Sequence, residues 1–141
     1  MKDFPNVLEH GIETVQSGVF PLAGNWSKDH FKNNNPLVLE LACGKGEFAL
    51  AMAKMWPERN YLGIDIKGAR MYVGANEALS SDLRNVAFLR TRIDFVETFF
   101  GEDEVDEIWI TFPDPQPQDN RAKKRLTSPM FIDRYRKLLK K

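Results

Sequence analysis

An acidic residue held between two prolines is the feature of this sequence best suited to chemistry. Asp114 stands in Pro113-Asp114-Pro115, shortly after the apolar run Ile108 to Ile110. Proline fixes its own φ angle and pushes the residue before it toward extended conformations, so the Asp114 carboxylate points in a narrow range of directions. Ligands of open α/β sheets sit at the carboxyl ends of the strands, which is where this acid lies. Asp114 is therefore a candidate catalytic residue.

A dense group of basic residues follows this turn. Residues 121–141 hold nine Lys or Arg and one Asp, a balance of +8, although the formal net charge of the whole chain is zero. An asymmetry of this kind indicates a polyanionic partner for the basic end, with Arg121, Lys123, Lys124 and Arg125 as the obvious patch. The alternative is a solvated, lysine-rich terminal helix that needs no partner.

A second set of candidate residues surrounds a glycine turn. The run Glu40 to Ala49 ends one predicted strand and begins a helix, with Gly44 and Gly46 between them. Glycines let the backbone approach a ligand closely, and an acid some twenty residues on, here Asp65, can accept hydrogen bonds from the hydroxyls of a ribose. The spacing also satisfies the loose dinucleotide fingerprint, which a purely structural tight turn explains as well.

Two cofactors, NAD and S-adenosylmethionine, fit this pattern. The Glu40 carboxylate would repel the pyrophosphate of NAD, whereas it suits the cationic amino group of the methionine part of S-adenosylmethionine. Asp114 ends a later strand, close to where the reactive end of that cofactor would lie. The two acids therefore favour S-adenosylmethionine, although Glu40 could also be a satisfied polar group at a strand end.

Alternating strands and helices must position these residues. Short apolar runs predict strands at residues 37–41, 61–65, 86–89 and 105–112, and helices are expected at 47–55, 67–83 and 93–100. A final helix is expected to begin after Thr127 or Ser128, with Pro129 in its first turn. The apolar stripe of that helix consists of Phe131, Tyr135 and Leu138, and the apolar face of the helix at 67–83 consists of Ala69, Tyr72, Val73, Asn76, Leu79 and Leu83. Four alternations predict an α/β fold, an open parallel sheet with helices on both faces.

The bulk properties limit the remaining possibilities. A length of 141 residues suits one domain, which we expect over residues 36–141 after an N-terminal arm or cap over residues 1–35. The single cysteine, Cys43, excludes an intramolecular disulfide, and neither His10 nor His30 has metal-ligand spacing, so no metal site is expected. Neither a signal peptide nor a membrane-spanning run is visible, which makes the reducing cytoplasm the expected location.

Taken together, the motifs resemble the bacterial tRNA (guanine-N7)-methyltransferase family, a branch of the class I S-adenosylmethionine-dependent methyltransferases. The matching segments are residues 24–26, 39–48, 61–67, 85–86, 111–115 and 124–127, with Arg70, Phe131 and Tyr135. The resemblance implies a Rossmann-like fold, tRNA as the partner, and methyl transfer to N7 of a guanine. Residue by residue, it implies cofactor contacts from Glu40, Cys43, Gly44, Gly46 and Asp65, a position for Asp114 facing both cofactor and base, and RNA contacts from Arg121, Lys123, Lys124 and Arg125.

Three positions depart from the family pattern. Gln116 stands where many members have Trp, and Gln118 stands where many have a Lys that contacts the substrate. Arg92 occupies the slot near the adenine where an acid is usual. By position, Gln118 is thus a candidate RNA contact and Arg92 a candidate cofactor contact.

The family also continues well past residue 141, so the sheet is expected to lack its last strands. The strand at 105–112 would then be an apolar sheet edge, which invites pairing or aggregation. We expect either a second chain over this edge, as in a homodimer, or marginal stability. Two other functions stay open beside tRNA methylation: a class I methyltransferase with a small-molecule substrate, and a truncated, non-catalytic domain that binds S-adenosylmethionine or RNA.

Overall fold

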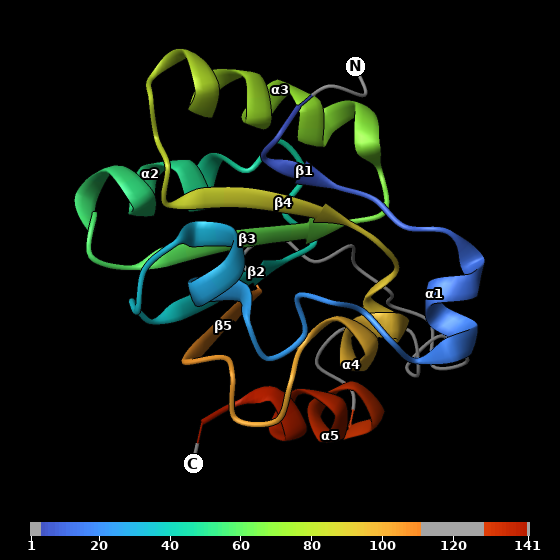
Figure 1. Ribbon diagram of the computed structural model, residues 1–141. Coiled ribbons are helices and arrows are strands. Elements are labelled where there is room, and N and C mark those ends of the chain that lie inside the picture. The colour runs from blue at the N-terminus through green and yellow to red at the C-terminus, as the bar shows by residue number, and fades with distance from the viewer. Residues whose placement is uncertain (1–3, 111–128, 141) are drawn as a thin grey trace.

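The described part of the chain folds into a five-stranded parallel sheet with helices on both faces (Figure 1). The computed structural model describes residues 4–110 and 129–140. The strands are β1 (Val7–Leu8), β2 (Leu37–Leu41), β3 (Asn60–Asp65), β4 (Val86–Arg90) and β5 (Glu107–Ile110), and the helices are α1 (Ile12–Ser17), α2 (Glu47–Met55), α3 (Gly68–Ser80), α4 (Val96–Phe99) and α5 (Pro129–Leu138). A π-helix, η1 (Trp26–Phe31), and a 3₁₀ turn, η2 (Ile93–Phe95), complete the described elements. The predicted α/β class is confirmed.

Strand β2 is the most deeply buried strand, since all five of its residues are buried. It pairs in parallel with β3 and with β5, in the sheet order β1-β4-β3-β2-β5. The register places Glu40 beside Gly63 on one side and beside Trp109 on the other. Because all the strands run in the same direction, their carboxyl ends lie along one edge of the sheet, and the loops after β2, β3 and β4 meet there.

Alternate residues of each strand pack into two separate cores. Leu39 and Leu89 belong to a core on the side of α4 and α5, whereas Val38 and Phe88 belong to a core on the side of α2 and α3. In Figure 1, α2 and α3 lie above the sheet and α4 and α5 lie below it. A fully buried Leu or Phe side chain contributes about 1.5–3 kcal/mol, so burial on both faces supplies most of the driving force for this sheet.

Helix α3 buries a different face from the one that its apolar residues predict. Val73 and Leu79 are 54% and 42% exposed. The buried residues are Gly68, Met71, Gly74, Ala75 and Ala78. The reason is close packing, because a Cβ on Gly74 would overlap the carbonyl group of Lys45. No larger residue fits at position 74, where α3 lies against the turn after β2, whereas Val73 and Leu79 lie on the outward side of the helix. The helix also ends at Ser80 instead of the predicted Leu83, and Asp82 adopts a φ of +54°.

The first 35 residues contribute to the sheet and to its core. Strand β1 adds to β4 at one edge of the sheet, which the breaker-rich sequence of this segment did not predict. Trp26 is fully buried in the core on the α4 side, and its indole Nε1 donates to the carbonyl of Phe99 at 2.7 Å. The Glu104 carboxylate accepts from the backbone N–H of Gly24 at 2.7 Å and of Trp26 at 2.9 Å. These contacts tie the Gly-x-Trp element to the loop before β5.

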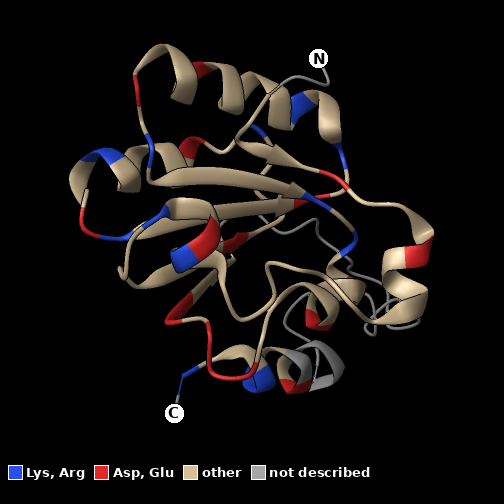
Figure 2. Ribbon diagram, viewed as in Figure 1, with Lys and Arg blue, Asp and Glu red and all other residues tan. Residues whose placement is uncertain are grey.

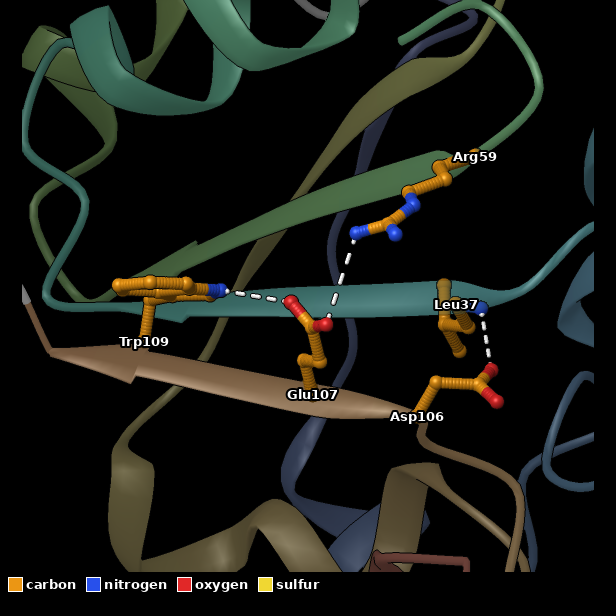
Figure 3. A network of polar contacts seen from close by, with 5 residues as sticks. All are labelled: Leu37, Arg59, Asp106, Glu107 and Trp109. Carbon is orange, nitrogen blue, oxygen red and sulfur yellow. Dashed lines mark hydrogen bonds and ion pairs between the residues drawn. The ribbon is translucent and has the colours of Figure 1, made fainter.

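Strand β5 is the opposite edge of the sheet, as predicted. Figure 3 shows that Glu107 accepts from Trp109 Nε1 at 3.0 Å and pairs with Arg59 at 3.5 Å, while Asp106 accepts from the backbone N–H of Leu37 at 2.7 Å. Trp109 itself is 43% exposed. The described strand is shorter than the predicted range 105–112, of which residues 111 and 112 lie outside the described residues.

The chain after α5 returns to the start of this edge. Val105 and Leu139 form a parallel β-bridge, in which Val105 N–H donates to Leu138 O at 2.9 Å and Lys140 N–H donates to Val105 O at 2.8 Å. Tyr135 and Leu138 of the predicted stripe are buried in the core. The bridge covers Val105, just before β5, and leaves residues 107–110 with β2 as their one described pairing partner.

Candidate functional site

The turn between β2 and α2 has an unusual backbone, with three of its five residues at positive φ. Ala42, Gly44 and Gly46 adopt φ angles of 57°, 57° and 75°. A Cβ on Gly44 would meet no atom within 4 Å, so the backbone at this position faces open space that a ligand can enter. A Cβ on Gly46 would instead overlap the ring of Phe88, so this glycine is needed for packing. The two glycines therefore have different roles.

Asp65 at the end of β3 holds this turn in place. Its Oδ2 accepts from the backbone N–H of Gly44 at 2.8 Å, and its Oδ1 accepts from the N–H groups of Ile66 at 2.7 Å and of Lys67 at 3.2 Å. A carboxylate offers about four acceptor positions, so one remains on Oδ2. Asp65 can thus orient the glycine turn and accept one further hydrogen bond from a ligand.

A hollow of about 420 Å³ lies between this turn and the beginning of α3. Its lining residues are Ala42, Cys43, Gly44, Lys45, Glu47, Asp65, Ile66, Lys67 and Arg70. The sequence predicted cofactor roles for Cys43, Gly44 and Asp65, which line the hollow, and for Gly46, which belongs to the turn but does not line the hollow. The hollow combines an accessible backbone, an acid with a spare acceptor position and an apolar side chain, Ile66, that is 49% exposed. This donor and acceptor set suits a nucleoside.

Cys43 contributes to the geometry of the turn through its backbone. Its N–H donates to Ile64 O at 3.1 Å, which extends the β2–β3 ladder into the turn. The side chain is 7% exposed. Burial, together with the negative charges of Glu40 and Asp65, raises the pKa of the Cys43 thiol well above its ordinary value. The thiol is therefore neutral at physiological pH and is a poor nucleophile.

Glu40 lies behind the hollow and does not line it. The side chain is 3% exposed, and its Oε1 accepts from the backbone N–H of Ala49 at 3.3 Å. Ala49 is the third residue of α2, so Glu40 supplies the carboxylate that caps this helix from a neighbouring strand. The negative charge lies close to the glycine turn, where it can act on a ligand through its electric field.

A second hollow of about 240 Å³ adjoins the first along Ile66. Its lining includes Arg92, which pairs with Asp94 at 3.0 Å and lies 5.6 Å from the centre of the Phe95 ring. Sequence reasoning missed His10 at this place, where its Nε2 is hydrogen-bonded to Thr91 Oγ1 at 2.8 Å. Nothing in the sequence indicated this position for His10, because the strand that precedes it, β1, has only two residues and no recognisable pattern.

The remaining predicted site residues lie outside the described residues. These residues are Asp114, Gln118, Arg121, Lys123, Lys124 and Arg125. Their roles therefore stay predictions. Within residues 4–110 and 129–140, no group of three or more His, Cys, Asp or Glu side chains is placed to hold a metal ion. In the same part of the chain, no helix has both the length and the apolar character needed to cross a bilayer.

Solved structures with the same arrangement define the class of fold. A structure titled "Structure of an Antibiotic Related Methyltransferase" superposes with a TM-score of 0.67 over 87% of this chain and 62% of that one, at 16% identity. An S-adenosylmethionine-dependent methyltransferase from Aquifex aeolicus superposes with a TM-score of 0.58 over 93% and 68%, at 15% identity. The fold is that of the class I S-adenosylmethionine-dependent methyltransferases.

Sequence comparison places the chain more narrowly. Residues 34–141 match the model of a family described as "Putative methyltransferase", and the chain belongs to this family. It is 50% identical over 139 residues to a tRNA (guanine-N(7)-)-methyltransferase of Bacteroides fragilis, with 99% of this chain and 54% of that protein covered. It is 51% identical over 137 residues to the enzyme of that name from Christiangramia forsetii, with 97% and 61% covered. The resemblance noted from the motifs is confirmed, and the chain spans between half and two thirds of the length of these relatives.

Proposed function

We propose that this chain is the cofactor-binding part of an enzyme that transfers a methyl group from S-adenosylmethionine to N7 of a guanine in tRNA. The observation that carries the proposal is the hollow in which the Asp65 carboxylate accepts from the Gly44 N–H, in a chain about 50% identical to proteins named for this reaction. Because tRNA is processed in the cytoplasm, we also propose a cytoplasmic location.

The hollow fits the nucleoside part of the cofactor. Asp65 has one acceptor position left for a ribose hydroxyl, and the backbone at Gly44 lies open to a ligand. Ile66, half exposed between the two hollows, offers an apolar surface for a base. When bound, S-adenosylmethionine supplies a methyl group on a positively charged sulfur. We assign cofactor binding to Asp65, to the turn from Cys43 to Gly46 and, through its charge, to Glu40, with Arg92 beside the base.

The reaction requires no general base from the protein. The N7 atom of guanine has a lone pair in the plane of the ring, so it needs no deprotonation before it attacks. That lone pair forms the new bond to the methyl carbon while the carbon–sulfur bond breaks. The protein's task is alignment, because holding the two partners about 3 Å apart in line removes much of the entropic cost.

Asp114 is the residue that we propose orients the base. It stands between two prolines after β5 and can accept from the exocyclic amine of guanine. The positive charge on sulfur disappears in the reaction, so a tight ion pair with that sulfur would stabilise the ground state and slow transfer. Asp114 therefore acts as an orienting residue. We assign contacts with the RNA to Gln118, Arg121, Lys123, Lys124 and Arg125.

A methyl-transfer assay on unmodified tRNA tests this function. The chain is incubated with S-adenosylmethionine carrying a labelled methyl group, and the modified nucleoside is identified after digestion of the tRNA. We expect 7-methylguanosine, and at least about a hundredfold less of it with Asp114→Ala, since a misplaced base loses its alignment. Calorimetric binding of S-adenosylmethionine without any transfer would instead indicate a non-catalytic binding domain.

The edge of β5 that no described strand covers leads to a proposal about assembly. Residues 107–110 pair with β2 on one side, and the bridge at Val105 covers the beginning of the other side. We propose that a strand of a second copy covers the rest of this edge, since an exposed apolar edge otherwise promotes aggregation. Light scattering at high concentration should then report a dimer, and a stable monomer would contradict this arrangement.

A further inference from the structure

Three exposed basic side chains surround the mouth of the larger hollow, and we name them the cationic rim. Lys45 comes from the glycine turn, and Lys67 and Arg70 come from the beginning of α3. In the sequence, Lys45 and the pair on α3 are more than twenty residues apart. The fold brings them together because β2 and β3 are neighbours whose following loops meet at the same edge of the sheet.

No carboxylate among the described residues pairs with any of these three cations. Many other basic residues of the described part do have such partners, although Lys28 and Lys32 do not. Figure 2 shows how basic and acidic residues are distributed over the ribbon. The ion pairs include Lys54 with Glu77, Arg59 with Glu107, Arg84 with Asp82, Arg90 with Glu9 and Arg92 with Asp94, at nitrogen–oxygen distances of 2.9 to 3.5 Å. Within residues 4–110 and 129–140, the rim is therefore a group of three neighbouring cations that form no ion pair.

The acids of the lining offset only part of the positive charge of the rim. Asp65 lies on the floor of the hollow, and its oxygens accept from the backbone of Gly44, Ile66 and Lys67. Glu47 is the other acid of the lining, so the five charged side chains there sum to one positive charge. The acid that is satisfied by backbone donors faces inward, whereas the cations are exposed to solvent.

The rim does not serve the stability of α3. The first turn of a helix favours acids, because its unpaired N–H groups carry partial positive charge. Helix α2 follows this rule with Glu47 in its first turn, whereas α3 has no acid in its first turn and has Lys67 at its N-cap. Arg70 follows within the same turn. Cations in this position oppose the helix dipole and repel one another. Their presence therefore favours a role in binding an anionic partner over a role in the stability of the helix.

We propose that Lys45, Lys67 and Arg70 contact phosphate groups of the bound RNA, on a surface separate from the basic segment at residues 121–125. The inference rests on the proposed function for the identity of the polyanion. RNA is the partner that this surface fits, since phosphates in a strand present repeated charges to several cations at once. Contacts at the mouth of the cofactor hollow hold the strand beside the reacting base and add affinity without base selectivity.

The test is the salt dependence of tRNA binding by the whole chain, measured by filter binding between about 50 and 300 mM KCl. The double variant Lys67→Gln/Arg70→Gln keeps a polar side chain at both positions and removes two charges. Each lost phosphate contact lowers the slope of log Kd against log salt by about 1, so we expect a slope smaller by about 2. Lys45→Gln alone should lower it by about 1.

The matched control is Lys54→Gln/Arg84→Gln, which removes the same charge from two cations that line a hollow at the amino end of the sheet. Both have carboxylate partners, at 3.4 and 3.2 Å, and the slope of this variant should equal that of the wild type. Equal slopes for both double variants, or a wild type without salt-dependent binding, would overturn the proposal. A calorimetric loss of S-adenosylmethionine affinity with an unchanged slope would overturn it as well, because the rim would then serve the cofactor's carboxylate. Because tRNA binding is measured without methyl transfer, the result of this test can be interpreted even if the transfer assay fails.

Discussion

The two ends of strand β3 carry polar residues that differ in their hydrogen-bonding partners. Asn60 begins the strand and is fully buried, and its side chain exchanges hydrogen bonds with Asn33 at 2.7 and 3.1 Å and donates to Ser27 Oγ at 3.0 Å. Asp65 ends the strand, is partly exposed, and keeps an acceptor position directed at a hollow. At the start of the strand, the polar side chain forms hydrogen bonds inside the protein. At its end, the polar side chain keeps an acceptor position that a ligand can use.

A hollow alone does not distinguish the two ends. The hollow at the amino end has about 350 Å³, close to the 420 Å³ at the carboxyl end. At the amino end, however, the Asn85 amide donates to the carbonyls of Ala53, Trp56 and Arg59 at 2.9 to 3.2 Å. Polar groups that are satisfied inside the protein offer nothing to a ligand, so what marks a site is the capacity left over.

Among the variants that test this comparison, the largest effect is expected at a helix residue that does not line the hollow. Gly74→Ala places a methyl group where the Lys45 carbonyl lies, so the glycine turn or α3 must move. Overpacking of this kind costs about 1–3 kcal/mol, and we expect S-adenosylmethionine to bind at least about tenfold more weakly in a calorimetric titration.

Gly68→Ala is the matched control, on the same helix. A methyl group there meets the Arg90 side chain at 3.0 Å, and that side chain can move away. Affinity close to the wild type is expected for this variant. If both alanine variants bind the cofactor equally well, the position of the turn does not determine binding.

Asn60→Ala should separate stability from binding. The side chains of Asn33 and Ser27 lose a buried partner, which lowers the free energy of unfolding by about 2 kcal/mol. Since the change lies at the far end of β3, affinity for S-adenosylmethionine should stay within about twofold. Urea denaturation and calorimetry measure the two quantities. A loss of affinity as large as the loss of stability would show that the two ends of the strand are coupled.

Asp65→Asn should have the complementary effect at the carboxyl end. An amide replaces one acceptor oxygen by a donor, which then faces the backbone N–H of Gly44 or of Ile66. We expect about a tenfold loss of S-adenosylmethionine affinity, or about 1.4 kcal/mol, with a smaller effect on stability than that of Asn60→Ala. Unchanged affinity would exclude Asp65 from the cofactor site.

The smallest effect is expected at Glu9. Hydrogen bonds from Arg90 and then from Tyr72 lower the pKa of its carboxyl below the ordinary value. A lowered pKa stabilises the fold at pH values above the ordinary carboxyl pKa, and the contribution is lost as the pH falls through the lowered pKa. Because the pair is exposed, Glu9→Gln should cost less than about 0.5 kcal/mol at pH 7. Urea denaturation at pH 7 and at a pH below the lowered pKa should show the difference vanish in acid.

Local patterns in the sequence predicted the elements at the carboxyl edge of the sheet. The apolar run 37–41 and the alanine-rich helix 47–55 match β2 and α2 residue for residue, because a fully buried strand and a proline-terminated helix have strong local signals. The glycine turn and Asp65 were also identified in advance, since glycine spacing and an acid at a strand end are local features.

Only the tertiary structure decided which polar and charged groups remain without a partner inside the described part of the protein and can therefore bind a ligand. The inward face of α3, the insertion of Trp26 and the position of His10 beside β4 all depend on contacts between residues more than 25 positions apart. The sequence specifies which residues are polar or charged and which segments form strands. Arg90 pairs with Glu9, 81 positions away, whereas Arg70 has no carboxylate partner among the described residues, and this difference depends on which side chains the fold places within reach. Local periodicity does not contain that information.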